Sequence, residues 1–140
     1  MITKEISGLR AISENYEIFI LDLWGTIYDG QALFPGIKAL LEQLKKRDKK
    51  VIFLSNSPQL PEVVHQRLGR LGLSTLHYDH LVTSGGEANS QLISMESKEF
   101  SAFNGKVFEI GPNRFPNTLP KEKFVSAENL SEAEWILNAG

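Results

Sequence analysis

Short apolar runs alternate along the first two thirds of the chain with segments of helical periodicity. Residues 16–23 (YEIFILDL) and 50–56 (KVIFLSN) are nearly continuous apolar runs, and 80–84 (HLVTS) is a shorter one. Runs of this length, rich in β-branched and aromatic residues, are typical of parallel strands covered on both faces. They predict three strands of one buried sheet.

A helical pattern follows each of these strands. Pro35 opens a helix that extends to about Asp48, and its apolar residues recur at positions i, i+3, i+4 and i+7. A second helix is predicted from about Leu60 to Leu71, with Gly72 as its C-terminal stop, and a third at 87–95. The inward faces of the first two helices are predicted to carry Ile37, Leu40, Leu41, Leu44, Val63, Val64, Leu68 and Leu71. Alternation of strand and helix predicts an α/β fold with a doubly wound parallel sheet.

The last part of the chain has a different texture. Strands are predicted at 105–111 (GKVFEIG), 123–127 (KFVSA) and 134–140 (EWILNAG), and the segment 112–122 contains three prolines and reads as a loop. A strand that ends in glycine normally leads into a next element. We therefore expect the chain to be the front portion of a longer protein.

Charge and composition narrow the range of partners. Fifteen basic and seventeen acidic side chains give a net charge of −2, which favours neither nucleic acid nor an anionic membrane as partner. The chain has no cysteine, so disulfides and thiolate zinc sites are excluded. The charged N-terminal segment lacks the apolar core of a signal peptide, and a cytoplasmic protein is expected.

Candidate chemistry gathers where the predicted strands end. The three strand ends carry Asp22 to Thr26, Ser55 to Ser57, and Thr83 to Gly86. Ligands of open parallel sheets bind at the carboxyl ends of the strands, and these groups suit a phosphate beside a magnesium ion.

Ordinary structural roles compete with this hypothesis at two of the three strand ends. SNSP and TSGGE are also typical of turns and helix caps, and the three histidines are expected on the surface. Asp22 stands out because a carboxylate that closes a buried strand is costly unless it has a function.

Taken in order, these motifs resemble the haloacid dehalogenase superfamily of hydrolases. The resemblance rests on LDLWGT and FLSNS for the first two motifs of the superfamily, and on FPGIKALLEQL, VTSGGEA, EIGPNRF and EWILNAG for its subclass IIA. It implies a Rossmann-like core, of which residues 1–86 are the N-terminal part, and an α/β cap that starts within 87–140. It also implies an uncharacterised branch with tryptophan after the nucleophile.

The resemblance implies a role for each residue of the motifs. Asp22 is expected to be the catalytic nucleophile, which forms an aspartyl-phosphate, and a ligand of Mg²⁺ together with the backbone carbonyl of Trp24. Ser55 is expected to hydrogen-bond the transferring phosphoryl group of a small phosphorylated metabolite. Residues 26–34 are expected to form a flap hairpin around the dipeptide Asp29-Gly30, which suits a tight turn because both positions tolerate positive φ. The expected substrate contacts are Trp24, Gly25, Thr26, Asn56 and Thr83, and self-association is left open.

Two departures from the superfamily pattern affect the expected activity. Trp24 stands where the phosphatases carry a second aspartate, and an indole cannot transfer a proton, so turnover should fall by about 10²–10⁴-fold. The lysine and acidic metal motifs would lie beyond residue 140, so this chain alone is expected to bind Mg²⁺ weakly and turn over little. Two alternatives remain: a carbon–halogen hydrolase, because the dehalogenases carry an aromatic residue at this position, and a non-catalytic module that binds phosphorylated ligands.

Overall fold

A computed structural model of the chain describes residues 5–94, 105–111 and 119–139. The chain divides into two compact units, Met1–Leu54 with Arg67–Leu81 and Ser55–Gln66 with Val82–Gly140. In chain order the strands and helices are β1 (Ile18–Asp22), α1 (Ile37–Lys46), β2 (Lys50–Ser55), α2 (Pro61–Arg70), β3 (His80–Thr83), α3 (Ser84–Ser94), β4 (Lys106–Ile110), β5 (Val125–Ser126) and β6 (Trp135–Asn138). Every strand predicted from an apolar run is present, and each is one to three residues shorter than predicted.

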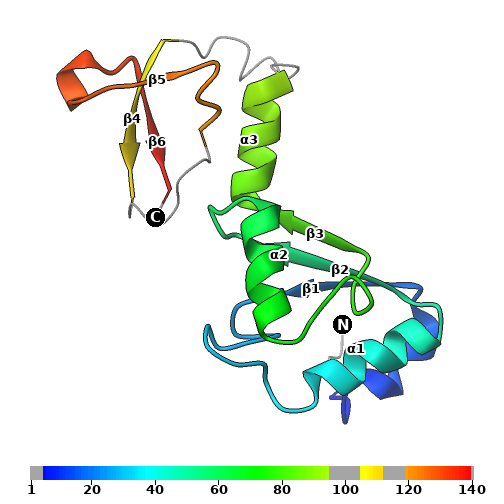
Figure 1. The fold of residues 1–140 in the computed structure, drawn as a ribbon. Helices are drawn as coiled ribbons and strands as arrows, with labels where there is room; N and C mark the ends of the chain where they lie inside the picture. The colour runs from blue at the N-terminus through cyan, green and yellow to red at the C-terminus, as the bar shows by residue number, and fades with distance from the viewer. Residues whose placement is uncertain (1–4, 95–104, 112–118, 140) are drawn as a thin grey trace. The chain divides into compact units, whose positions relative to one another are not determined.

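The first sheet has the strand order β1-β2-β3 (Figure 1). β1 and β2 are parallel, and their register pairs Phe19 with Val51 and Asp22 with Leu54. A parallel sheet with flanking helices confirms the predicted α/β class. In the part of the chain that the structure describes, no helix is long and apolar enough to cross a membrane.

The two faces of this sheet differ in their exposure to solvent. Phe19, Val51 and Phe53 are buried, and the ring of Phe53 packs against that of Tyr78 at a centroid distance of 4.6 Å. On the other face Ile18, Ile20 and Leu54 keep 56%, 62% and 50% of their surface exposed. The prediction that both faces are covered is therefore wrong for these three side chains within the described residues. Strand periodicity alone does not show which face receives a cover.

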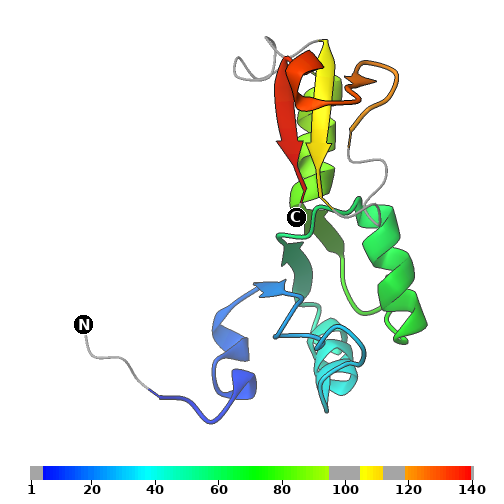
Figure 2. The ribbon, with the colours of Figure 1, turned by 90° about the vertical axis from the view of Figure 1, so that its left-hand side faces the viewer.

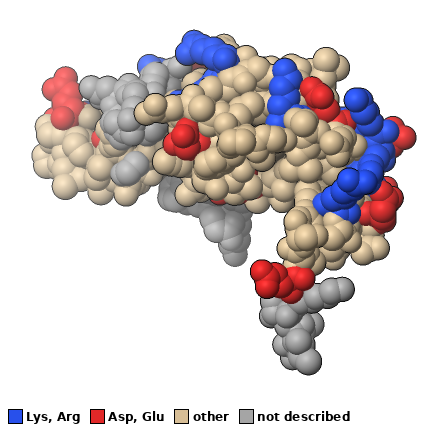
Figure 3. All heavy atoms as spheres, turned by 90° about the horizontal axis from the view of Figure 1, so that it is seen from below, with Lys and Arg blue, Asp and Glu red and all other residues tan. Residues whose placement is uncertain are grey.

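Asp79, which directly precedes β3, links α1 and β2 within the first unit. Its carboxylate accepts hydrogen bonds from the ammonium groups of Lys45 at 2.7 Å and Lys50 at 3.4 Å, and from the backbone N–H of Val51 at 2.8 Å. The hydrogen bond from Lys45, followed by that from Val51, lowers the pKa of Asp79 to about 2. Basic and acidic side chains lie next to one another on the face of the molecule in Figure 3.

Replacing Asp79 with asparagine is expected to lower the free energy of unfolding at pH 7 by about 1.5–3 kcal/mol, the value of hydrogen bonds to charged groups. Because the folded-state pKa lies below that of an unfolded aspartate, this contribution is complete above about pH 4 and is lost as the pH falls toward 2. Urea unfolding at pH 7, 4 and 2.5 measures it. The difference between wild type and D79N should shrink with falling pH, and a pH-independent difference would contradict the assignment.

A matched control uses the exposed ion pair between Arg47 and Glu14. Glu14 is well exposed, so replacing it with glutamine should cost about 1 kcal/mol or less.

The second unit carries its own three-stranded parallel sheet, in the order β5-β4-β6. Figure 2 shows α3 behind β4 and β6. Its buried cluster consists of Leu92, Val107, Leu119 and Phe124, with Trp135 and Leu137 packed against it. The rings of Phe124 and Trp135 meet edge to face at a centroid distance of 5.1 Å, so Trp135 forms part of this core.

Two details of the first unit differ from the sequence prediction. His77 is buried rather than on the surface, and its Nδ1 accepts the backbone N–H of Ser74 at 3.0 Å. α1 begins at Ile37, two residues after Pro35, because Gly36 takes a left-handed conformation with φ 83°. α2 ends at Arg70, and Gly72, two residues later, has φ 86° and stops the helix as predicted.

Part of the sequence prediction falls outside the described residues. This applies to Met95 in the third predicted helix, to residues 112–118 of the predicted proline-rich loop, and to Gly140.

Candidate functional site

A tight turn follows β1 and presents the predicted nucleophile. The carbonyl of Leu23 accepts three backbone N–H groups, those of Thr26 at 3.3 Å, Ile27 at 2.8 Å and Tyr28 at 3.2 Å. The side chains of Leu23, Ile27 and Tyr28 are buried, whereas Asp22 and the segment 24–26 are exposed. Buried side chains therefore anchor the turn in the core, and the carboxylate of Asp22, the indole of Trp24 and the hydroxyl of Thr26 face outward.

The carboxylate of Asp22 lies at the carboxyl end of β1. Its Oδ1 accepts the backbone N–H of Leu23 at 2.8 Å, which orients the group and leaves Oδ2 for a ligand. The parallel register places Leu54 opposite Asp22, and Ser55 follows Leu54 as the last residue of β2.

The flap hairpin predicted at residues 26–34 is present. An antiparallel bridge joins Tyr28 to Leu33, and the N–H of Phe34 donates to the carbonyl of Ile27 at 3.0 Å. The predicted two-residue turn is wrong, because four residues separate the bridge partners. Asp29 closes this wider turn instead.

Oδ1 of Asp29 accepts the N–H groups of Gln31 and Ala32, both at 2.8 Å. The hydrogen bond from Ala32, and then that from Gln31, lowers the pKa of Asp29. Within the dipeptide, positive φ is confined to Gly30, at 102°. A side chain that bonds its own turn in this way makes positive φ at the aspartate unnecessary.

Two oxygen atoms of the turn are suitable ligands for a hard cation. The bridge between Trp24 and Tyr28 uses the N–H of Gly25, which donates to the Tyr28 carbonyl at 2.9 Å, and the N–H of Tyr28, which donates to Leu23. The carbonyl of Trp24 takes no part in it. Oδ2 of Asp22 and this carbonyl are oxygen ligands of the kind that Mg²⁺ prefers. Among the described residues, no group of three acidic, histidine or cysteine side chains is placed to complete such a site.

Ser55 ends β2 with a nearly buried side chain, 8% exposed. Its hydroxyl accepts the backbone N–H of Ser57 at 3.2 Å, and the hydroxyl of Ser57 accepts that of Gln59 at 3.2 Å. A hydroxyl that accepts from the backbone still has its own hydrogen to donate. Ser55 is therefore positioned as a hydrogen-bond donor at the end of β2.

The loop at residues 56–59 is fastened to the beginning of α3. The N–H of Gly85 donates to the carbonyl of Ser57 at 3.0 Å, and the hydroxyl of Ser84 donates to the carbonyls of Asn56 at 2.8 Å and Ser57 at 2.9 Å. A Cβ on Gly85 would lie 1.9 Å from the carbonyl oxygen of Pro58. Ser84 and Gly85 belong to the third strand end named from the sequence, but their contact with this loop was not predicted, because no local pattern reports a contact with residues so distant in the sequence.

Thr83 joins the same contact. Its hydroxyl donates to the carbonyl of Gln59 at 2.7 Å and accepts the N–H of Gly86 at 3.0 Å, and its side chain is 1% exposed. Thr83 thus caps α3, which begins at Ser84 rather than at Glu87. The capping role foreseen for this segment is confirmed, and the substrate contacts of Thr83 and Asn56 stay predictions.

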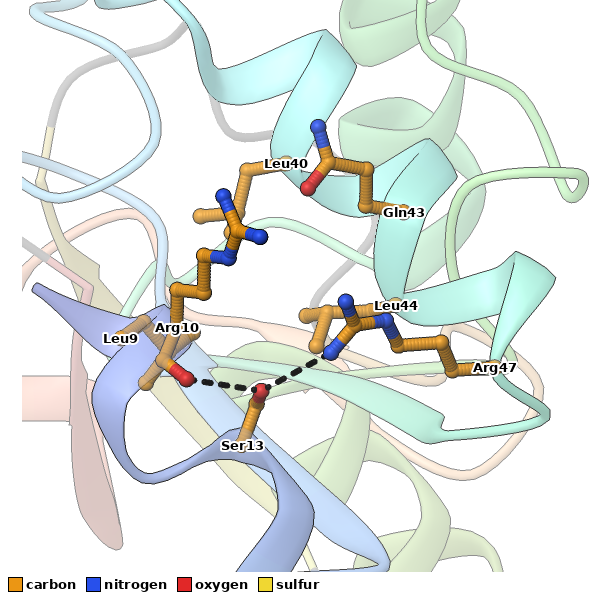
Figure 4. Close-up of a pocket in the computed structure, with 7 residues that line it drawn as sticks. All are labelled: Leu9, Arg10, Ser13, Leu40, Gln43, Leu44 and Arg47. Carbon is orange, nitrogen blue, oxygen red and sulfur yellow. Dashed lines mark hydrogen bonds between the residues drawn. The ribbon is translucent and has the colours of Figure 1, made fainter.

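One small cavity lies between α1 and two short 3₁₀ turns, Leu9–Ala11 and Ser13–Asn15 (Figure 4). Its volume is about 20 Å³, room for about one water molecule. The hydroxyl of Ser13 donates to the carbonyl of Arg10 and accepts from the guanidinium of Arg47 at its rim. No predicted site residue lines it.

Comparison with known proteins gives consistent matches. A haloacid dehalogenase-like hydrolase of Brucella suis matches with a TM-score of 0.78 and 24% identity over 94% of this chain and 47% of that structure. Glycerol phosphate phosphatase of Mycobacterium tuberculosis in complex with magnesium matches with a TM-score of 0.64 and 18% identity over 92% of this chain and 37% of that structure. These two likenesses show the fold.

The curated relatives are matched over a shorter stretch. The chloroplastic phosphoglycolate phosphatase 1A of Arabidopsis thaliana is 28% identical over 57 residues, which are 41% of this chain and 16% of that protein. The chain thus spans a small part of the curated relatives and about half or less of the solved structures. The haloacid dehalogenase-like hydrolase family matches residues 19–124. The predicted resemblance is confirmed, and the chain belongs to the haloacid dehalogenase-like hydrolase family.

Proposed function

We propose that this chain carries the nucleophile half of a Mg²⁺-dependent hydrolase of small phosphorylated metabolites. The observation that carries the proposal is the turn after β1, which holds an exposed, oriented carboxylate at the carboxyl end of a parallel strand. Family membership supports a hydrolase, and Ser55 ends β2 with a hydroxyl that can donate a hydrogen bond to a phosphoryl group.

The proposed reaction begins with attack of Oδ2 of Asp22 on the phosphorus atom. A new O–P bond forms as the bond from phosphorus to the leaving oxygen breaks, and water then hydrolyses the aspartyl-phosphate to release phosphate and restore the carboxylate. The hydroxyl of Ser55 donates a hydrogen bond to a phosphoryl oxygen. Asp22 and the Trp24 carbonyl would hold Mg²⁺, which offsets negative charge on the phosphoryl group. The exposed positions of Gly25 and Thr26 suit contacts with the same group.

Asp29 is the other acid near this turn, but it is unsuitable as a proton donor to the leaving group. Two N–H groups occupy Oδ1 of Asp29 and lower its pKa, so the group is ionised at neutral pH. The indole of Trp24 does not titrate. We therefore expect the turnover rate of alkyl phosphates to be about 10²–10⁴-fold lower than at a site with a positioned acid.

Chemical trapping tests the nucleophile without requiring fast turnover. The chain is incubated with Mg²⁺ and acetyl phosphate, whose leaving group needs no proton, and is then treated with borohydride, which converts aspartyl-phosphate to homoserine. Peptide mass spectrometry should find homoserine at position 22. Asp29 is an internal control in the same exposed segment and should remain aspartate. Homoserine at position 29, or at neither position in folded protein, would contradict the proposal.

A further inference from the structure

The indole of Trp24 is exposed yet held in place. The side chain keeps 54% of its surface exposed. Its backbone is fixed on both sides by the bridge to Tyr28, and the N–H of the next residue, Gly25, donates to the Tyr28 carbonyl at 2.9 Å. An exposed aromatic side chain on a fixed backbone loses little conformational entropy when it binds a ligand.

The flap hairpin supports the ring from one side. A Cβ built on Gly30 would lie 3.8 Å and 4.0 Å from ring atoms Cζ2 and Cη2 of Trp24, so the benzene part of the indole rests against the turn. Gly30 has φ 102°, which an L side chain rarely adopts. The turn therefore offers bare backbone where the ring lies, and about half of the surface of Trp24 stays open to solvent.

The ring is within reach of a group bound at Asp22. Residues 22 and 24 are two positions apart, so their Cα atoms are separated by at most about 7 Å. A phosphorus atom held at the carboxylate would place the organic part of an ester within the span of the indole. The carboxylate and the ring are presented by one turn that buried residues anchor, so their relative placement is preformed.

We propose that Trp24 is a specificity-determining residue that selects phosphorylated compounds with a planar, apolar leaving group, which stacks on the indole. This inference rests on the proposed function and narrows its substrate class. Stacking of aromatic groups adds to the energy of burial, whereas a polyol gains little from an indole face. Esters of aromatic alcohols also need less help from an acid, because their leaving anions are more stable. Such substrates suit this turn, in which the second acid, Asp29, is ionised and bonded to its own backbone.

Two non-hydrolysable ligands that differ only in the ring test the inference. Isothermal titration calorimetry with Mg²⁺ compares phenylphosphonate with methylphosphonate on wild-type chain, W24A and W24F. Wild type should bind phenylphosphonate about three- to tenfold more tightly, W24A should lose the preference, and W24F should keep part of it. Tyr16→Ala is the matched control, since Tyr16 is 53% exposed in the same unit, and it should keep the full preference.

The outcomes separate this inference from the proposed function. Equal binding of the two phosphonates to wild type, or a preference that W24A retains, would overturn the role of Trp24 and leave the nucleophile assignment standing. Binding of neither phosphonate to folded wild type would overturn both. Circular dichroism of each variant establishes folding, which the exposed positions of both aromatic residues should preserve.

Discussion

Replacing Gly85 with alanine is expected to lower the free energy of unfolding by about 3 kcal/mol, through a clash with the main chain and the loss of a hydrogen bond. The new Cβ would lie 1.9 Å from the carbonyl oxygen and 2.3 Å from the carbonyl carbon of Pro58. Neither atom belongs to a flexible side chain, so the loop or the helix must move. The movement would break the 3.0 Å hydrogen bond from Gly85 to Ser57 and displace the loop that follows Ser55.

Gly69→Ala is the matched control for this clash. Gly69 lies within α2, is exposed, and has no atom within 4 Å of an added Cβ. Alanine there should stabilise the chain by about 0.5–1 kcal/mol, because it favours the helix and restricts the unfolded chain. Urea unfolding followed by circular dichroism compares the two variants. Equal stability of G85A and G69A would contradict the prediction, because it would show that the contact between Gly85 and the Pro58 carbonyl is not tightly packed.

Replacing Asp22 with asparagine is expected to reduce aspartyl-phosphate formation by about 10³-fold or more, as removal of a nucleophile does in other enzymes. The amide keeps an oxygen that can accept the N–H of Leu23, so the turn should remain folded. It cannot attack phosphorus as a carboxylate does, and it is a weaker ligand for Mg²⁺. The initial rate of phosphoryl transfer from acetyl phosphate, measured with Mg²⁺, gives the loss.

Asp29→Asn is the control in the same turn. Asparagine retains the oxygen that accepts the N–H groups of Gln31 and Ala32, so the hairpin should persist and the rate should stay within about threefold. A large loss in D29N together with a small one in D22N would reverse the assignment of the two acids. Thermal unfolding of both variants separates misfolding from lost chemistry.

The apolar patterns predicted the strands and helices well, because local periodicity reports burial. β1 and β2 appear where apolar runs stand, and α1 buries Leu41 and Leu44 from the predicted stripe. The start of α3 was misplaced because two glycines disfavour a helix by intrinsic propensity. Contact with Pro58, far away in the sequence, requires glycine at that point, and no local signal reports such a crossing.

The candidate site was predicted as a set of strand ends, and the structure places Asp22, Ser55 and Thr83 at the ends of β1, β2 and β3. Their catalytic and binding roles stay predictions. The sequence did not predict that Thr83 would be buried, since a hydroxyl at a strand end suits a ligand as well as a carbonyl. His77 was predicted on the surface because its loop is polar. It is buried instead, and the backbone N–H of Ser74 supplies a hydrogen bond to its ring.

The two tryptophans also make the chain its own optical probe. Trp24 lies in the unit Met1–Leu54 with Arg67–Leu81, and Trp135 lies in the other unit, packed against Phe124. The chain has no further tryptophan. The half-exposed indole emits at longer wavelength than the packed one, so intrinsic fluorescence distinguishes the two environments without a label. Each unit therefore reports its own opening, and a ligand that covers Trp24 would be visible as a change in one component of the emission spectrum.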